Sequence, residues 1–266
     1  MKIGFIGVGN MASAIIKGVL SQGSFTKRDI YCYDVNTERL DDFAQENMIN
    51  TVASNEELIE QVDLILLAIK PNLFKTVLPS LKDSLQKKQP IIVSIAAGIQ
   101  LETIEKLVGD NLAIIRIMPN VNALIKESVS AICYNEKTTQ KHLVVAKTIF
   151  NAVGKTFMIA EKDFAAFTAI GGCGPAFVFM FIDALATGGL KNGIPKDVAT
   201  EIAIQTVLGS AKMLQESDKH AAQLIDMVCS PGGSTIAGVA SLEENSFKST
   251  MIQALEATIK RDQEMR

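Results

Sequence analysis

Two glycines at the start of a helical pattern are the residues of this chain best suited to chemistry. Gly7, Gly9 and Ala12 form a G-x-G-x-x-A pattern directly after the apolar run 3–6. Gly7 permits a tight turn, Gly9 lacks a Cβ and so lets a phosphate approach the backbone, and Ala12 lets the helix pack closely. The N–H groups of a helix N-terminus favour a diphosphate. The pattern therefore predicts dinucleotide binding by Ile6, Gly7, Val8 and Gly9, against the alternative of a turn that only packs a helix on a sheet.

Small residues and prolines follow three later apolar runs, at 68–71, 94–98 and 118–120. Open parallel sheets bind ligands at the carboxyl ends of their strands. We expect these loops to form a floor for the nicotinamide half of the cofactor, although ordinary strand-to-helix turns would explain any one of them. The residues predicted to contact the cofactor here are Ala68, Ile69, Lys70, Pro71, Ala96 and Ala97.

The choice between NADH and NADPH stays open in the sequence. Asp34 follows the second apolar run, where an acidic residue usually binds the ribose 2′-hydroxyl of NAD. Asn36, Thr37 and Arg39 come directly after it and are suited to holding a 2′-phosphate. Asn55 precedes a helical pattern, where it either caps the helix or reaches the adenosine side of the cofactor.

Two glycine-rich segments of the second half, 171–176 and 230–235, each open a helical pattern. The N–H groups at such helix starts suit a small substrate that carries a carboxylate. Ser234 and Thr235 add hydroxyl groups at the second segment. The alternative is that both segments are only helix caps.

Composition excludes several classes of protein. The 266 residues are 48% hydrophobic and 21% charged, which is typical of a folded globular chain, and the net charge of −3 argues against nucleic acid or an anionic membrane as a partner. Four scattered cysteines and two histidines predict no metal site, and His142 and His220 lie among charged residues as solvated side chains do. No targeting segment is visible, so we expect a cytoplasmic protein.

Strand-like and helix-like segments alternate through the first half. Near-continuous apolar strands joined by helices predict a parallel sheet that is covered on both faces, as in a Rossmann-like doubly wound α/β domain. The expected strands are 3–6, 30–33, 64–69, 91–95, 113–118, 129–134 and 156–159. The expected helices between them are 37–48, 56–61, 73–85, 101–108 and 138–153.

From about residue 161 the pattern becomes all-helical. Long helices are expected at 176–190, 196–215 and 245–262, with breaks at Gly188-Gly189 and at 193–195. The stretch 176–190 is short and contains Asp183, so we interpret it as a buried helix and not as a membrane span. The apolar faces exceed what about a hundred residues can cover, which predicts a homodimer, unless the first domain covers them. The predicted domains are 1–160 and 161–266.

These pieces together resemble the pyrroline-5-carboxylate reductase family along the whole chain. The matching motifs are G-x-G-N-M-A at 7–12, A-I-K-P at 68–71, S-I-A-A-G at 94–98, M-P-N at 118–120, G-C-G-P-A-F at 172–177 and S-P-G-G-S-T-I-A-G at 230–238. The resemblance implies a Rossmann domain followed by a helical dimerisation domain. It also implies dimers that assemble into rings, such as a decamer of five dimers, and hydride transfer from NAD(P)H to the C=N carbon of L-1-pyrroline-5-carboxylate to give L-proline.

The resemblance also implies roles for individual residues. Thr235 matches the threonine that hydrogen-bonds the substrate ring nitrogen, and Gly233 and Ser234 match backbone donors to the carboxylate. Glu161 matches an acidic residue near the substrate, and Asn10 and Met11 match residues over the cofactor phosphates. The chain departs from the family pattern beside the site, where Val121-Asn122 replace the family's usual Thr-Pro and Cys173 replaces its usual serine.

Two other classes of protein fit the same plan less well. A β-hydroxyacid dehydrogenase needs a base, commonly a lysine on the first helix after the Rossmann domain, and 171–183 contains none. A dinucleotide-sensing protein would bind the cofactor without turnover and has no need of the turn at 230–235. Imine reduction suits this chain because the cofactor carries the difficult chemistry and little acid–base help is required.

Overall fold

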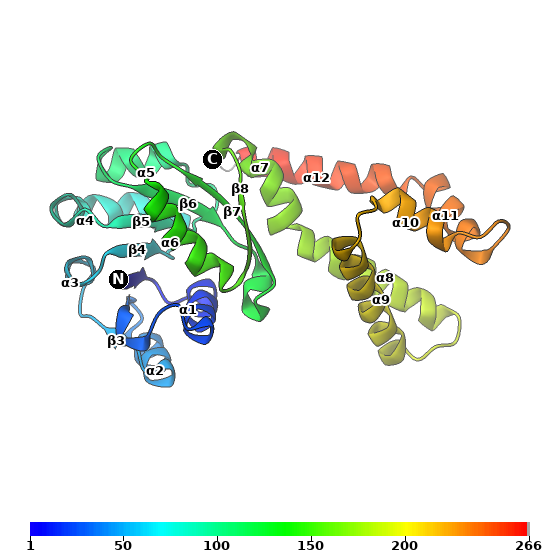
Figure 1. Cartoon of the computed structure of the whole chain (residues 1–266), viewed down its shortest axis with the longest axis horizontal. Coiled ribbons are helices and arrows are strands. Elements are labelled where there is room, and N and C mark those ends of the chain that lie inside the picture. The colour runs from blue at the N-terminus through cyan, green and yellow to red at the C-terminus, as the bar shows by residue number, and fades with distance from the viewer. Residues whose placement is uncertain (265–266) are drawn as a thin grey trace. The chain divides into compact units, whose positions relative to one another are not determined.

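The computed structural model describes residues 1–264 and divides into two compact units (Figure 1). The first unit comprises residues 1–172 together with 259–264, and the second comprises 173–258. The segment 161–172, which the sequence placed in the helical domain, therefore belongs structurally to the first unit. Its Phe164 is fully buried in the core of that unit, which attaches this segment to the first unit.

The first unit is built on a sheet of eight strands in the order β3-β2-β1-β4-β5-β6-β7-β8. All neighbouring strands are parallel except β6 and β7, so the prediction of a purely parallel sheet is wrong at this one pair. The reason is the connection 119–127, which is shorter than the dozen or so residues of a parallel crossover. The strands are β1 Ile3–Ile6, β2 Ile30–Tyr33, β3 Asn50–Thr51, β4 Leu64–Leu67, β5 Ile91–Ser94, β6 Ile114–Met118, β7 Ser128–Tyr134 and β8 Gly154–Met158.

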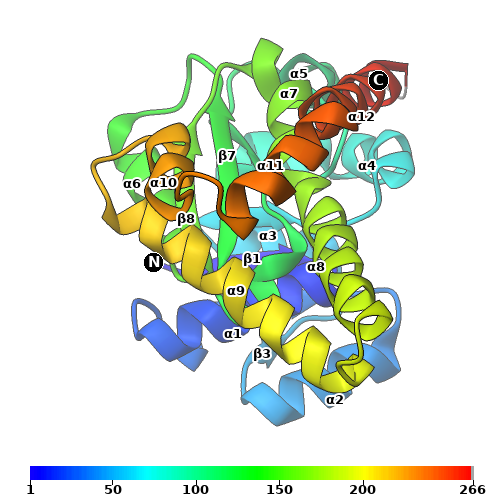
Figure 2. The same cartoon turned by 90° about the vertical axis from the view of Figure 1, so that its right-hand side faces the viewer.

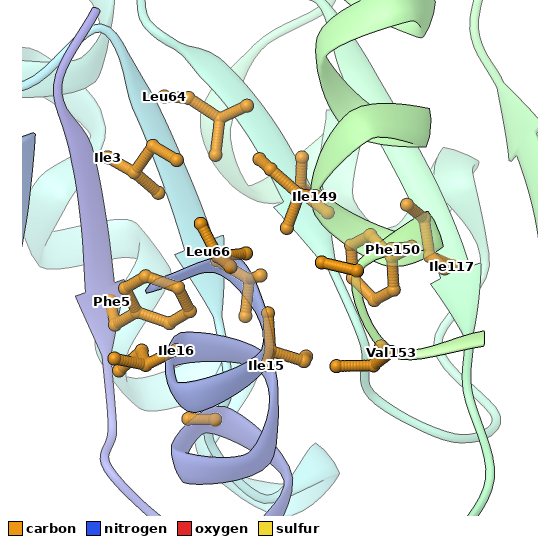
Figure 3. Close-up of a cluster of buried hydrophobic side chains, with 14 of the residues drawn as sticks. Ile3, Phe5, Ile15, Ile16, Leu64, Leu66, Ile117, Ile149, Phe150 and Val153 are labelled. Carbon is orange, nitrogen blue, oxygen red and sulfur yellow. The ribbon is translucent and has the colours of Figure 1, made fainter. Parts of the chain in front are cut away.

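Helices cover both faces of this sheet, which confirms the doubly wound α/β fold. One apolar cluster joins a sheet face to α1, α2 and α6, and Figure 3 shows Phe5, Ile15 and Phe150 among its members. A second cluster joins the opposite face to α3, α4, α5 and Phe164. The helices are α1 Asn10–Gln22, α2 Thr37–Asn47, α3 Asn55–Gln61, α4 Phe74–Lys88, α5 Leu101–Val108 and α6 Gln140–Asn151.

Short helical segments complete the first unit. They are η1 Lys27–Asp29, η2 Pro71–Leu73, η3 Val121–Ile125, η4 Glu161–Asp163, α7 Phe164–Phe167 and the π-helix η5 Thr168–Gly172. The sequence missed them, together with the two-residue strand β3, because segments this short carry no measurable periodicity. The longer strands and helices of this unit lie within a few residues of their predicted bounds.

Five helices make the second unit, in which α8 and α9 pack as a hairpin (Figure 2). The prediction that Gly188-Gly189 breaks α8 is wrong. A Cβ on Gly189 would lie only 2.9 Å from the Ala199 Cβ, so the glycine serves close packing of the two helices. The single helix predicted for 245–262 is α12, the helix start predicted at 230–235 is that of α11, and α10 was not predicted. The bounds are α8 Gly174–Lys191, α9 Lys196–Glu216, α10 Ala221–Val228, α11 Ser234–Glu244 and α12 Phe247–Glu264.

Large apolar side chains are exposed along α8 in the described chain. Phe179 is 60% exposed and Met180 is 71% exposed, so the prediction of a buried helix is wrong for a single chain. By length and composition alone, the helical stretch 161–191 would suffice to cross a membrane. The only buried cluster of the second unit among the described residues is made of Ala186, Ala199 and Ala203.

Candidate functional site

The glycine turn between β1 and α1 has the geometry that a dinucleotide phosphate requires. Gly7 has φ +97°, and a Cβ there would lie 2.8 Å from the Ala68 carbonyl oxygen, so no other residue fits without strain. Gly9 is the N-cap of α1, and a Cβ on it would meet nothing within 4 Å. The space beside Gly9 and the N–H groups of the first turn of α1 together form a cradle for a phosphate.

Asp34 fixes this turn from the end of β2. Its buried carboxylate accepts hydrogen bonds from the Val8 N–H at 2.8 Å and from the Asn36 N–H at 2.9 Å. It also accepts one from the Arg39 guanidinium at 2.6 Å. Burial by itself would raise the pKa of Asp34, but these three donors outweigh it and hold the pKa below its ordinary value. Asp34 is therefore ionised, and its carboxylate is engaged in hydrogen bonds within the protein.

A cleft of ≈ 510 Å³ opens beside the turn, at the carboxyl ends of β1, β2 and β4. It brings together eight residues that the sequence predicted as cofactor contacts: Ile6, Gly7, Gly9, Asp34, Asn55, Ala68, Ile69 and Lys70. The sequence did not predict five other residues that line it: Tyr33, Val35, Asn72, Leu73 and Val77. Asn72 carries a usable signal because it directly follows a strand-end loop, whereas Val77 lies on α4 and is brought in only by the fold.

The structure distinguishes between the two roles that the sequence left open for Asn55, helix capping and contact with the cofactor. The N-cap of α3 is Ser54, whose side chain accepts from the Glu57 N–H, so the capping interpretation of Asn55 is wrong. The Asn55 Oδ1 atom is buried without a hydrogen-bond partner, although Asn55 lines the cleft. A buried polar atom of this kind needs a partner. Together with the cradle at Gly9, it shows that the residues present fit a dinucleotide.

Seven predicted cofactor residues do not line this cleft. Val8 is buried beneath the turn and supplies its N–H to Asp34, and Asn36 caps α2 by accepting from the Arg39 N–H. Ala96 is buried in the loop after β5. Of the other four, Asn10 and Met11 begin α1, Pro71 begins η2 and Ala97 lies in the loop after β5.

Glu161 begins η4, shortly after β8, within the first unit. Its Oε1 atom accepts from the Leu101 N–H at 2.8 Å and from the Arg116 guanidinium at 2.9 Å. Arg116 is 3% exposed, and its guanidinium lies 4.4 Å from the centre of the Phe164 ring. The sequence singled out Glu161 but gave no signal for Arg116, which sits inside an apolar strand.

Asn120 holds the end of the same segment. Its amide nitrogen donates to the Gly171 carbonyl oxygen at 2.7 Å, and its backbone N–H donates to the Ser128 hydroxyl at 3.1 Å. The M-P-N motif thus fixes the π-helix η5 to β6 and β7. The segment 171–176 is accordingly not the open glycine turn that the sequence predicted, because helical backbone continues from η5 through Cys173 into α8.

The turn at 230–235 lies in the second unit and opens α11. Gly232 has φ +69°, Gly233 is the N-cap, and the Gly233 N–H donates to the Ser230 carbonyl oxygen at 3.0 Å. A Cβ on Gly233 would collide with the Ser230 hydroxyl. Ser234 and Thr235 occupy the first turn of α11 and are exposed in the described chain, so their hydroxyls and N–H groups are accessible.

The cysteines divide between the two units. Burial raises the pKa of the Cys32 thiol to about 12, with a further contribution from the Asp34 charge. Burial also raises the pKa of Cys133 to about 12, and the Glu161 charge adds to it. Both thiols are therefore unreactive, whereas Cys173 and Cys229 of the second unit are half-buried.

Family models match both parts of the chain. Residues 161–265 match a model of pyrroline-5-carboxylate reductase dimerisation, and residues 2–98 match a model described as NADP oxidoreductase, coenzyme F420-dependent. The similarity therefore extends to both the glycine turn and the turn at 230–235.

Similarity to the same family extends over the full length of known relatives. The chain is 39% identical over 266 residues to pyrroline-5-carboxylate reductase of Arabidopsis thaliana, covering 99% of this chain and 95% of that protein. Among solved structures, 1-pyrroline-5-carboxylate reductase of Streptococcus pyogenes is 43% identical with a TM-score of 0.87, covering 98% of each chain. The enzyme of Plasmodium falciparum, solved with NADP bound, is 35% identical with a TM-score of 0.88, covering 100% of this chain and 98% of that one.

Proposed function

This chain belongs to the pyrroline-5-carboxylate reductase family, and from that premise we propose how its residues serve the reaction. It is an NAD(P)H-dependent oxidoreductase that reduces the C=N bond of L-1-pyrroline-5-carboxylate to give L-proline. The observation that carries the proposal is the cleft beside the glycine turn. There the space next to Gly9 can accept a phosphate, and the unpaired Oδ1 of Asn55 can accept a hydrogen bond from a dinucleotide.

The cofactor is assigned to the first unit. The N–H groups of Asn10 and Met11, at the start of α1, hold the diphosphate, and Asn55 binds the adenosine side. When bound, NAD(P)H supplies the hydride. The strand-end residues Ala96 and Ala97 would form the floor of the nicotinamide side, because open parallel sheets bind ligands at the carboxyl ends of their strands.

Both NADPH and NADH are compatible with the second strand. A free acidic residue at the end of β2 would repel a 2′-phosphate, but the Asp34 carboxylate is paired with Arg39 and with two backbone donors. The side chain of Arg39 is 51% exposed and lines the same cleft, with guanidinium donors to spare. We therefore assign acceptance of a 2′-phosphate to Arg39, and expect Asp34 not to exclude NADPH.

The substrate is assigned to the turn of the second unit. The Ser234 N–H group suits its carboxylate, since helix N-termini favour anions, whereas the Gly233 N–H is used by the Ser230 carbonyl oxygen within the turn. The Thr235 hydroxyl both donates and accepts, so it steadies the ring nitrogen as the imine becomes an amine. Hydride transfer needs two planar groups held face to face more than it needs a strong acid or base.

Self-association completes the assignment. Residues 161–265 match the family's dimerisation model, so the chain forms a homo-oligomer. We propose a dimer through the helical domain 161–266, with a decamer of five dimers as the larger form. A partner copy, and not lipid, is assigned to the apolar face of α8, because Asp183 of that helix is ion-paired with Lys196 of α9 and charge inside a bilayer is costly. We also propose a cytoplasmic location.

A spectrophotometric assay at 340 nm tests the proposal. Pure protein is mixed with pyrroline-5-carboxylate and either NADPH or NADH, and oxidation of each cofactor is followed separately. Substrate-dependent loss of absorbance is expected with both. Tight cofactor binding without turnover would overturn the substrate assignment, and turnover with NADH alone would overturn the role given to Arg39.

A further inference from the structure

The inference concerns Glu161 and rests on the proposed function. Arg116 lies in the middle of the sheet, on β6, almost fully buried. The Glu161 carboxylate is the ion-pair partner that the described structure gives it, at 2.9 Å, and the Phe164 ring lies against the face of its guanidinium. A buried arginine without a carboxylate is strongly unfavourable, so the pair fixes the position of Glu161.

The same oxygen of Glu161 also fixes the loop after β5. It accepts from the N–H of Leu101, the first residue of α5, at 2.8 Å. Leu101 and Ala96 both belong to the buried cluster on this face of the sheet, and 95–100 is the whole connection between β5 and α5. This connection contains Ala96 and Ala97, which are assigned to the nicotinamide side.

A second bond from β6 fixes the far end of the segment to which Glu161 belongs. Asn120 follows β6 directly and holds the Gly171 carbonyl oxygen at 2.7 Å. The segment 161–172 is thus attached to the sheet at both ends, by Arg116 and by Asn120. The Arg116–Glu161–Leu101 network ties one of these attachments to the loop of the cofactor site.

We propose that Glu161 is a positioning residue of the reductase and not a substrate contact. Its carboxylate, aligned by Arg116, holds the start of α5 and thereby sets the position of the 95–100 loop, which would form the floor of the nicotinamide side when the cofactor is bound. Substrate affinity then depends on the turn at 230–235, whereas the rate of hydride transfer depends on this network. The proposal replaces the role that the family resemblance implied for Glu161.

A double-mutant cycle tests the proposal in the full-length enzyme. Glu161→Gln, Arg116→Met and the double variant are compared by kcat, by KM for pyrroline-5-carboxylate and by the Kd of NADPH from fluorescence. We expect each single variant to lower kcat at least tenfold, KM to change less than threefold, and the double variant to be no worse than the poorer single variant. Asp163→Asn, which removes an exposed charge from the same segment, is the matched control and should match the unaltered enzyme.

A second measurement does not depend on turnover. Amide hydrogen exchange of 95–101 in the cofactor-free protein should speed up at least tenfold in Glu161→Gln and stay unchanged in Asp163→Asn. A selective tenfold rise in KM with Arg116→Met kinetically silent would identify a substrate contact and overturn the proposal. Unchanged exchange together with unchanged kcat would also overturn it. If the unaltered enzyme reduces no imine, the proposed function is wrong. The exchange measurement then still tests whether Glu161 holds the 95–101 segment.

Discussion

The two units of this chain bury apolar surface very differently. In the first unit, two large clusters of fully buried side chains cover both faces of the sheet, and the glycine turn sits on that rigid base. In the second unit, the buried cluster within the described residues consists of three alanines, while large side chains of α8 and α9 face outward. The first unit has the core of an independent domain, whereas the second needs a further surface to cover its helices.

Because of this difference, the two sites are held in shape by different kinds of contact. The cofactor cleft is held by contacts inside one unit: Asp34 to Val8, and Gly7 against Ala68. The turn at 230–235 is defined by local backbone, with Gly232 at positive φ and Gly233 as an N-cap. We therefore expect the first site to respond to substitutions in the sheet and the second to respond to self-association.

The largest expected effect is loss of the cofactor from the first unit. Gly9→Val places a side chain in the phosphate cradle, and the Kd of NADPH should rise at least 1,000-fold, about 4 kcal/mol. The fold should survive, because a Cβ at Gly9 meets no atom within 4 Å. Gly7→Ala is the contrasting variant and should lower the melting temperature. Fluorescence titration and circular dichroism measure both, and normal affinity in Gly9→Val would contradict the phosphate assignment.

The next effect tests the exposed helices of the second unit. Leu208 on α9 is 59% exposed, and Leu208→Asp should weaken self-association by about 3 kcal/mol or more, since each copy loses about 1.5–3 kcal/mol of apolar burial. Val144 on α6 of the first unit is 63% exposed, so Val144→Asp is the matched control. Light scattering over a dilution series should show dissociation of the first variant alone. Dissociation of both would remove the contrast between the units.

A third effect tests the turn of the second unit. Thr235→Ala should lower kcat/KM for pyrroline-5-carboxylate by about one to three orders of magnitude, roughly 1.4–4 kcal/mol, because the ring nitrogen loses its hydroxyl partner. Thr235→Ser keeps the hydroxyl and should recover most of the activity. The Kd of NADPH should stay unchanged in both variants. Unaltered kinetics in Thr235→Ala would rule out its role.

The smallest expected effect concerns the stability that Asp34 contributes to the first unit. Asp34→Asn should cost about 1–3 kcal/mol of stability at pH 7, the usual price of disrupting charge-assisted hydrogen bonds. The folded pKa of Asp34 is lowered, so this contribution is present above its ordinary value of 3.8 and is lost as pH falls below it. Urea unfolding at pH 7, 5 and 3 should show the gap closing at the lowest pH. Exposed Asp41→Asn should show no gap at any pH.

Several features of the fold were predictable from local patterns. The strands β1, β2 and β4–β6 are short apolar runs, and α5 was predicted with its observed bounds at Leu101–Val108. Both were predictable because the burial of a strand or of one helix face requires apolar residues at a regular spacing. The reversed direction of β7 was not predicted, since the short connection before it looks like any other turn. Gly188-Gly189 was misread as a helix break because a glycine that serves helix–helix contact resembles one that ends a helix.

The sequence by itself determined the glycine turn, the helix starts that suit anions and the excess of apolar helix surface. Each of these follows from residue types within a few positions of one another. Only the tertiary structure decided that the Asn55 Oδ1 atom lacks a hydrogen-bond partner, that Arg39 forms an ion pair with Asp34, and that Glu161 pairs with Arg116. These relationships join residues from different elements, and the partners of a buried charge are set by how the sheet brings strand ends together.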